Sequence, residues 1–530
     1  CTASGDWSGS RNTSGSQTFT SLTADSTFNL NCSGAGGSVN GSVNVTVSAP
    51  APVPTVSLSA SPESITSGES TTINWTSTDA SECTASGDWS GSRNTSGSQT
   101  FTSLTADSTF NLNCSGAGGS VSGTATITVS SVVGGSAICG ANSSCIEVKS
   151  YDCNLSNVHC VGSNQEFSTI QNGVDAATSG GHTVVVSEGT YQGFIVSNSG
   201  ENGNEILITT NRNNVIINQA ASGVNDNIYI SNSDDVIIEG FTVINAPAYG
   251  IGTHDASSGS PMERVTIRYN TVSNSNSTNI YISNSRNSLA LGNIAFDSLT
   301  SHGIYVANGG ADDTDVIGNV LFGNQKNGLH FNGDGSGDQG IHTGMIVSGN
   351  TIYDNTANGI DADGVSDSSF FNNLIYNNGR HGIRVFVIDA ENNGSSENLA
   401  IYNNTIVLNN SAIKVTDGNG GHSIFNNILM ENSESCISLA GNNDLNTDIS
   451  DNLYSSNCSF ELGTSYTAGQ VISNTTLVFT DFNSDDYSIK ATSPAIDAGL
   501  SNFDSIFAPS YDIEGIERND GYIDIGAYEI

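Results

Sequence analysis

A repeating pair of short apolar stretches runs through the body of the sequence and constrains its fold most. One stretch carries an asparagine, and these asparagines lie 23 to 31 residues apart: Asn270, Asn293, Asn319, Asn350, Asn373, Asn404, Asn427 and Asn452. The other has apolar residues on both sides of a variable residue, as in Ile280-Tyr281-Ile282. Self-similarity at this period predicts stacked coils, and the framework of a leucine-rich repeat is absent. Equivalent asparagines are expected to form a hydrogen-bonded ladder inside the turns.

The start and the end of this body carry distinctive segments. A helix is predicted by four apolar residues at helical spacing: Phe167, Ile170, Val174 and Ala177. With the strand that follows (HTVVVSEGTYQG), it resembles the N-terminal cap of right-handed parallel β-helices of the pectate-lyase type. The resemblance implies an all-β protein with a right-handed parallel β-helix over residues 164–479. SPAIDAG and DIGAYE resemble the C-terminal segment of exported bacterial proteins of the choice-of-anchor Q group, so residues 480–530 are expected to cap the β-helix.

A tandem copy precedes the body, since residues 1–39 and 83–121 are identical. Residues 55–131 alternate apolar and polar residues between turns, which predicts an antiparallel β-sandwich. Trp75 and two cysteines resemble the core of immunoglobulin-like domains, and the copy is similar to the immunoglobulin-like repeats of bacterial surface proteins. Residues 1–50 match only the C-terminal part of a repeat. Either preceding repeats are missing from the sequence, which is favoured, or another subunit supplies the absent strands.

The composition limits which kinds of partner and which cellular compartment are expected for this chain. The chain has 52 acidic and 13 basic residues and a net charge of −39. This charge argues against nucleic acid and membrane surfaces as partners, and it attracts divalent cations. The ten cysteines lie in local groups, which is typical of disulfides in an extracellular or cell-surface protein. The predicted pairs are Cys1–Cys32, Cys83–Cys114 and Cys436–Cys458, with Cys139, Cys145, Cys153 and Cys160 of the connector (residues 132–163) paired among themselves.

The outward side of the repeating strand is the candidate site. Side chains alternate across a strand and coils stack at about 4.8 Å, so equivalent positions form rows. The first predicted row consists of Tyr281, Tyr305, His330, Asp361, Arg384 and Lys414. The second row lies beside it and consists of Ser283, Ala307, Asn332, Asp363, Phe386 and Thr416. Five steps span about 24 Å, which fits several units of a linear polymer. The sequence predicts a glycan-binding groove with sugar contacts at Tyr281, Tyr305, Asn332 and Phe386.

A catalytic role for the same rows is the alternative. A polysaccharide lyase needs a positive charge on the uronate carboxylate, a base and an acid. Arg384, or a Ca²⁺ held by Asp361 and Asp363, would neutralise the carboxylate, and Lys414 or His330 would act as the base. A glycoside hydrolase would use Asp361 and Asp363 as its carboxyl pair, but a lyase is favoured. Motifs of known β-helix lyases and hydrolases are absent, so no catalytic residue is transferred from them.

Acidic loops suggest calcium as a cofactor. Asp334 lies in NGDGSGDQG, and Asp361 and Asp363 lie in DADGVSD, although neither loop has the EF-hand pattern. The remaining histidines show no metal-ligand spacing, and most of them are expected to be exposed loop residues: His159, His182, His254, His302, His342, His381 and His422.

These patterns predict an extracellular surface or fibre protein, in which immunoglobulin-like spacer repeats display a β-helix. The β-helix is expected to bind a polysaccharide or cell-surface glycan, or to mediate adhesion and assembly. Other copies of the chain are a second expected partner, through the incomplete first repeat. The alternative function is a polysaccharide lyase or glycoside hydrolase acting on an acidic extracellular polysaccharide.

Overall fold

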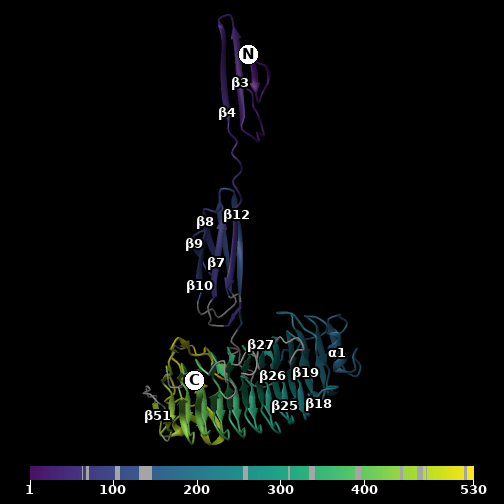
Figure 1. Cartoon of the computed structure of the whole chain (residues 1–530), viewed down its shortest axis with the longest axis vertical. Coiled ribbons are helices and arrows are strands. Elements are labelled where there is room, and N and C mark those ends of the chain that lie inside the picture. Colours follow the sequence, from purple (N-terminus) through teal and green to yellow (C-terminus); the bar gives the residue numbers. More distant parts are fainter. Residues whose placement is uncertain are drawn as a thin grey trace. The chain divides into compact units, whose positions relative to one another are not determined.

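The computed structural model of the chain forms two compact units, Cys1–Val132 and Val133–Ile530 (Figure 1). In the described residues, the regular secondary structure of both units is almost entirely β-strand, which confirms the predicted all-β class. The structure describes residues 1–61, 64–66, 71–101, 108–130, 146–254, 261–307, 311–333, 341–387, 396–418, 420–441, 446–456, 458–461, 470–472, 474–518 and 522–530. Cys139 and Cys145 lie outside the described residues.

The second repeat is a β-sandwich. One sheet has the order β10-β7-β5, with β5 (Thr55–Ser61), β7 (Thr71–Thr78) and β10 (Ser96–Phe101). The other has the order β6-β12-β11-β8-β9, with β6 (Ser64–Thr66), β8 (Glu82–Gly87), β9 (Gly91–Arg93), β11 (Ser108–Gly116) and β12 (Gly119–Ser130). Ile73, Trp75 and Phe110 are buried together, and the predicted disulfide Cys83–Cys114 joins β8 to β11.

The first repeat has a single sheet with the order β2-β1-β3-β4. Its strands are β1 (Thr2–Gly5), β2 (Gly9–Ser10), β3 (Ser26–Gly34) and β4 (Gly37–Val45), and the predicted disulfide Cys1–Cys32 is present. Val43 is 59% exposed, whereas its equivalent Ala125 in the complete sandwich is 6% exposed. The part of this face that carries Val43, which β5 and β7 cover in the second repeat, is therefore exposed in the first, while Phe28 is buried beside Trp7 and Phe19.

The second unit is a parallel β-helix with three sheets, and each coil passes through sheets 1, 2 and 3 in turn. Within the described residues, sheet 1 has 12 strands from β13 (Val158–Val161) to β48 (Asp448–Ser450). Sheet 2 has 12 strands from β15 (Gly189–Gln192) to β51 (Gln470–Ile472). Figure 1 shows the strands stacked along the β-helix, with α1 (Ile170–Ala176) at its beginning.

Sheet 3 carries the predicted outward rows. Its strands are β16 (Phe194–Val196), β19 (Ile228–Ser231), β22 (Ile251–His254), β26 (Ile280–Ser283), β30 (Ile304–Ala307), β33 (Leu329–Asn332), β37 (Ile360–Asp363), β41 (Ile383–Phe386), β44 (Ser411–Gly418), β47 (Ser435–Gly441) and β50 (Phe460–Glu461). The branched apolar residues of these strands point inward and are completely buried, as in Ile304 and Ile383. The residues between them therefore face outward.

The predicted asparagine ladder is present between sheets 1 and 2. Each amide Nδ2 donates to Oδ1 of the next asparagine at 2.9–3.1 Å, from Asn270 to Asn452. A second ladder between sheets 2 and 3 was not predicted: Asn324, Asn355, Asn378, Asn409 and Asn432. Each member follows a member of the first ladder by five residues, as Asn324 follows Asn319, so the signal was in the sequence.

The C-terminal segment covers the outer side of sheet 2 over the last coils. Phe479, Tyr487 and Ile489 form one buried cluster with Leu374 and Leu453 of the β-helix. The predicted pair Cys436–Cys458 is present, and Cys153–Cys160 agrees with the expected pairing of the connector cysteines among themselves. The segment therefore lies along the flank of the β-helix, where it shields apolar residues of sheet 2 from water.

Candidate functional site

The outward residues of sheet 3 stand in register from coil to coil. The first predicted row is confirmed by the strand pairing of Tyr281 with Tyr305, Tyr305 with His330, His330 with Asp361, Asp361 with Arg384, and Arg384 with Lys414. The second row pairs in the same way from Ser283 to Phe386. We call the outward side of sheet 3, with the turn residues immediately before its strands, the binding face.

Aromatic rings of the binding face stack on one another. The ring of Tyr249 lies parallel to Tyr281 with centroids 4.3 Å apart, and Tyr305 stacks on His330 at 4.8 Å. Tyr281 is only 9% exposed. Asn332 donates its Nδ2 to the hydroxyl of Tyr305 at 3.0 Å. Because the ring faces cover each other, these tyrosines present their edges to the outside. A sugar contact at Tyr281 or Tyr305 would therefore be made with a ring edge and not by stacking on an open ring face.

Asp361 is held inside a cage of donors. Nδ2 of Asn327 donates to Oδ2 at 3.0 Å, and Nδ2 of Asn358 donates to Oδ1 at 2.8 Å. The Arg384 guanidinium reaches Oδ1 at 3.4 Å. Burial raises the pKa of Asp361, against the lowering effect of His330 and Arg384. At 6% exposure this carboxylate is an internal anchor for its neighbours.

Two histidines lie face to face next to this cage. The rings of His302 and His330 have centroids 4.6 Å apart. Burial lowers the pKa of both, that of His302 far below its usual value, so both are neutral at pH 7. Nδ1 of His330 lies 3.0 Å from the backbone oxygen of Asp361 and so carries the hydrogen, which leaves a lone pair on Nε2. Nδ1 of His302 accepts the backbone N–H of Asn327, so its hydrogen is on Nε2.

The expectation that the remaining histidines are exposed is wrong for several of them. His159, His302, His342 and His422 are all buried. His159 lies in β13 and His342 in β34 (His342–Thr343), where neighbouring strands cover them. His302 and His422 lie in turns, and there a ring nitrogen bonds to the backbone of a neighbouring coil, as when Nδ1 of His422 accepts the N–H of Leu399. Periodicity predicts which residues lie near a turn but not that neighbouring coils cover them.

Basic side chains gather on the second half of the binding face. Arg384 lies over the ring of Phe386 at 3.6 Å, and its side chain is 29% exposed. Burial and the nearby cations Lys414, Arg384 and Arg380 lower the pKa of His381 to about 4. Lys414 and Arg380 form no ion pair with any described residue. Other arginines of the β-helix are paired: Arg264 with Asp235, Arg268 with Glu239 and Arg286 with Asp312.

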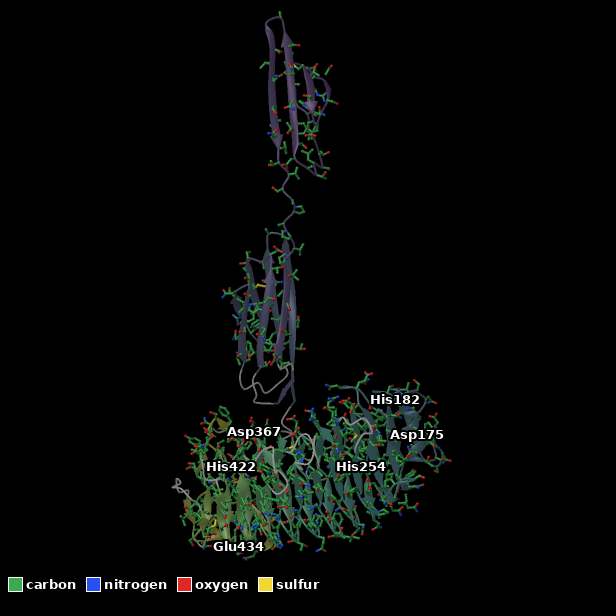
Figure 2. All side chains as sticks on the ribbon, viewed as in Figure 1. Asp175, His182, His254, Asp367, His422 and Glu434 are labelled. Carbon is green, nitrogen blue, oxygen red and sulfur yellow. A yellow bond between two sulfur atoms is a disulfide. The ribbon has the colours of Figure 1, made fainter. Side chains whose placement is uncertain are left out.

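The first half of the binding face contains a hydrogen-bonded histidine–aspartate pair that the sequence analysis missed. Nε2 of His254 lies 2.5 Å from Oδ2 of Asp226, which is 4% exposed (Figure 2 labels His254). The imidazole stacks on Tyr229 at 4.3 Å. The pair reaches across Gly252, where an added Cβ would lie 2.6 Å from both atoms. In the outward row, Gly252 lies between Tyr229 and Tyr281. A glycine at this outward position is the feature of the sequence that could have revealed the His254–Asp226 pair.

The metal prediction gains no support from the described residues. Asp334 lies outside them, and Asp361 and Asp363 are buried at 6% and 4% exposure. Within the described part of the chain, no group of three or more His, Cys, Asp or Glu side chains could hold a metal ion. Calcium binding stays a prediction. In the same residues, no helix is long and apolar enough to cross a membrane.

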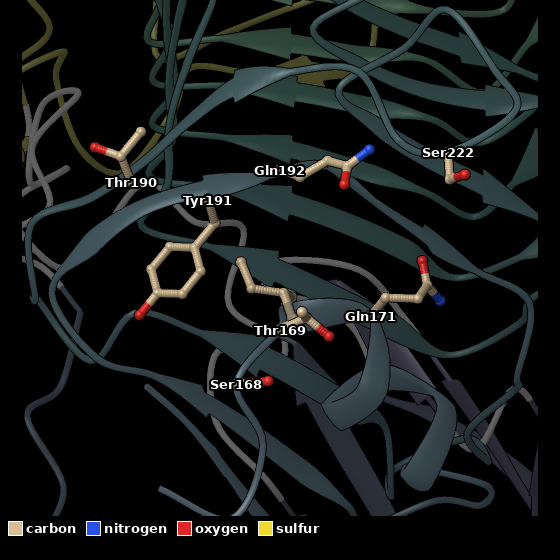
Figure 3. Close-up of a pocket in the computed structure, with 9 residues that line it drawn as sticks. Ser168, Thr169, Gln171, Thr190, Tyr191, Gln192 and Ser222 are labelled. Atoms are coloured by element: carbon tan, nitrogen blue, oxygen red, sulfur yellow. The ribbon is translucent and has the colours of Figure 1, made fainter. Parts of the chain in front are cut away.

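A pocket of about 280 Å³ lies beside α1 (Figure 3). It is lined by hydroxyl and amide side chains, among them Thr169, Gln171 and Tyr191. Gln171 exchanges hydrogen bonds with the backbone of Ile195, and the Tyr191 hydroxyl donates to the backbone oxygen of Ser187. These polar groups fasten α1 to the first coils, which confirms the predicted helix at this end.

Comparison with known proteins supports the fold. The family model described as right-handed beta helix region matches residues 278–460. The body of this chain is a right-handed parallel β-helix. The model described as periplasmic copper-binding protein (NosD) matches residues 129–333. No curated protein matches the sequence.

Solved structures with a similar fold include carbohydrate-active proteins. Pectate lyase Pel9A is 14% identical with a TM-score of 0.47, over 70% of this chain and 96% of that one. The A-module of the Azotobacter vinelandii mannuronan C-5 epimerase AlgE6 is 16% identical with a TM-score of 0.37, over 57% and 93%. The periplasmic alginate epimerase AlgG is 15% identical with a TM-score of 0.34, over 55% and 78%. At these identities and TM-scores, the likenesses carry no argument about activity.

Proposed function

We propose that the binding face of the β-helix holds an acidic polysaccharide. The observation that carries this proposal is the gathering of Lys326, Arg380, Arg384 and Lys414 on one face of a chain whose net charge is −39, with Lys326 next to His302 and His330. Cations gathered on one face of a strongly acidic protein attract carboxylates locally. A polymer of uronate units supplies such carboxylates, and in this proposal it lies along the rows.

The geometry of the basic residues fits a linear polyanion. Arg384 and Lys414 are paired in adjacent strands, so their charges lie about one coil spacing, ~4.8 Å, apart at the backbone. Contact with Asp361 and Phe386 orients the Arg384 guanidinium, which reduces the entropy lost on binding. Lys414 has no carboxylate partner among the described residues, so its charge is available to a ligand.

Polygalacturonate binding tests this proposal, measured by titration calorimetry. Lys414→Gln should weaken binding by about tenfold, the loss of one charge-assisted contact. Lys490→Gln is the matched control, because it removes the same charge from the C-terminal segment outside the binding face. Equal effects of the two substitutions, or no binding by the unaltered chain, would contradict the proposal.

A lyase is the second candidate function, and the neutral state of His330 favours it. In the proposed step, Nε2 of His330 takes the proton at C5 of a uronate. The electrons of the C–H bond form the C4–C5 double bond, the bond from C4 to the glycosidic oxygen breaks, and the imidazolium formed at His330 passes its Nε2 proton to that oxygen. Both Asp361 and Asp363 are buried, so they do not form the exposed carboxyl pair that a hydrolase requires.

Unsaturated products from polygalacturonate, which absorb in the ultraviolet, would report the lyase reaction. His330→Asn should lower its rate by at least about 100-fold while leaving polymer affinity within about twofold. Binding without any unsaturated product would reject the lyase and leave the binding function in place.

Several broader roles belong to the same proposal. The disulfides are typical of an exported protein, and we propose display at the cell surface by the sandwich repeats, with adhesion or assembly as the outcome. NosD is described as a periplasmic copper-binding protein. Because the described residues contain no suitable group of three ligands, copper binding is not proposed for this chain.

A further inference from the structure

The binding face has two halves that differ in charge. The strands β19, β22, β26 and β30, with the turn residues before them, contain no lysine or arginine in residues 225–231, 248–254, 277–283 and 301–307. The equivalent segments of the following coils contain all four cations of the face. A uronate carboxylate therefore has cationic partners only on the second half.

The first half contains a hydrogen-bonding site in place of cations. Asp226 accepts the backbone N–H of Tyr249 through Oδ1 at 3.2 Å and faces Nε2 of His254 through Oδ2. When Nε2 donates to Asp226, Nδ1 of the neutral ring is an acceptor. Nδ1 makes no hydrogen bond to any described residue, and the His254 side chain is 21% exposed.

Packing fixes the position of this acceptor. The imidazole is parallel to Tyr229 within 9°, and Tyr249 and Tyr281 flank it with centroids 5.8 and 5.5 Å away. Gly252 leaves the space through which His254 reaches the preceding coil. An acceptor set between aromatic edges and backed by a buried carboxylate suits a sugar hydroxyl, and the negative charge of Asp226 repels a carboxylate.

We propose that the first half binds an uncharged, hydroxyl-bearing sugar unit and the second half binds a uronate, so that the ligand is an acidic heteropolysaccharide. Gly252 and Arg384 are five coils apart, about 24 Å, so both kinds of unit must occur within one short stretch of polymer. This inference rests on the proposed binding of an acidic polysaccharide, and it excludes a pure polyuronate as the preferred ligand.

The test compares three polymers on the full chain. Hyaluronan alternates glucuronate with an uncharged N-acetylhexosamine, polygalacturonate is a pure polyuronate, and dextran is uncharged. We expect hyaluronan to bind at least about tenfold more tightly than polygalacturonate, and dextran most weakly. Gly252→Ala, whose methyl group displaces His254 and Asp226, should weaken hyaluronan binding by about tenfold and leave polygalacturonate binding unchanged.

Further variants separate this inference from the proposed function. His254→Ala should reproduce Gly252→Ala without altering the backbone at position 252, and Thr242→Val on sheet 2 is the control that should change nothing. Lys414→Gln should weaken both acidic polymers. If both acidic polymers bind equally and neither Gly252→Ala nor His254→Ala matters, the heteropolysaccharide is rejected and the basic face stands. If neither acidic polymer binds, or Lys414→Gln has no effect, both proposals are rejected.

Discussion

Asn373 illustrates how single residues hold the coils of this β-helix together. Its Nδ2 donates to the backbone oxygen of Val347 and to Oδ1 of Asn404, both at 2.9 Å. Its Oδ1 accepts both the side chain and the backbone N–H of Asn350. The residue is completely buried, so every lost partner would leave a polar group without water.

Asn373→Ala should therefore lower the free energy of unfolding by about 3 kcal/mol or more, because several buried groups lose their partners at once. Gln325→Ala, at an exposed turn of the same β-helix, should change it by less than about 0.5 kcal/mol. Urea unfolding followed by circular dichroism measures both. Similar losses for the two variants would mean that the ladder contributes no special stability.

A buried acid gives a second test at this scale. Burial is the main cause that raises the pKa of Asp315 to about 7 from an ordinary value of 3.8. The folded state holds this proton more tightly, so the stabilisation is complete below the ordinary pKa and is lost as the pH rises through the folded value. Relative to Asp315→Asn, the unaltered chain should lose stability between about pH 5 and pH 8. A constant difference in unfolding free energy over this range would refute the shift.

At the scale of elements, the contrast between the two repeats shows what one sheet contributes to a sandwich. The residues shared by β3 and β11 are identical, yet only the second repeat has β5 and β7 over its inner face. Val45 of β4 is consequently 39% exposed, whereas its counterpart Ile127 of β12 is 1% exposed. An apolar sheet face of this kind is complementary to strands with the sequence of β5 and β7.

A labelled peptide of residues 55–78 should therefore bind the full chain at the first repeat. The same peptide with Ile73→Asp and Trp75→Asp should bind at least about tenfold more weakly, because both residues are buried in the complete sandwich. Fluorescence anisotropy measures both affinities. Equal binding of the two peptides would show that the exposed part of this face does not select these strands, and would argue against assembly through it.

For the whole molecule, the charge distribution sets how an acidic polymer arrives. The net charge of −39 repels a polyanion at long range, while the cations of the binding face attract it at contact. The Debye length falls from about 30 Å at 0.01 M salt to about 8 Å at 0.15 M. Added salt therefore screens the repulsion of the whole chain before it weakens the short contacts at Arg384 and Lys414.

The association rate with polygalacturonate should consequently rise between about 0.01 and 0.15 M salt, and the dissociation rate should rise as well. Surface plasmon resonance measures the two rates separately. A falling association rate would mean that the local field of the basic half dominates at all distances. Lys490→Gln serves here as a control for charge outside the binding face.

Much of this architecture was predictable because a regular repeat period indicates which residues occupy equivalent positions in adjacent coils. The spacing of Asn270 to Asn452 predicted the first ladder, and the same reasoning placed Tyr281 to Lys414 in one row. The second ladder was equally readable, five residues further on. The sandwich of the second repeat followed from strand alternation and turns.

The sequence by itself determined the order of contacts along the β-helix axis, since each coil can stack only on the coils before and after it. Only the tertiary structure decided the directions and burial of side chains across that axis. Asp361 turned into a cage of amides, the tyrosine rings covered one another, and His254 reached Asp226 because Gly252 has no side chain. These outcomes depend on how side chains of neighbouring rows pack against one another. The repeat period gives the position of each residue along the β-helix but not the packing of its side chain.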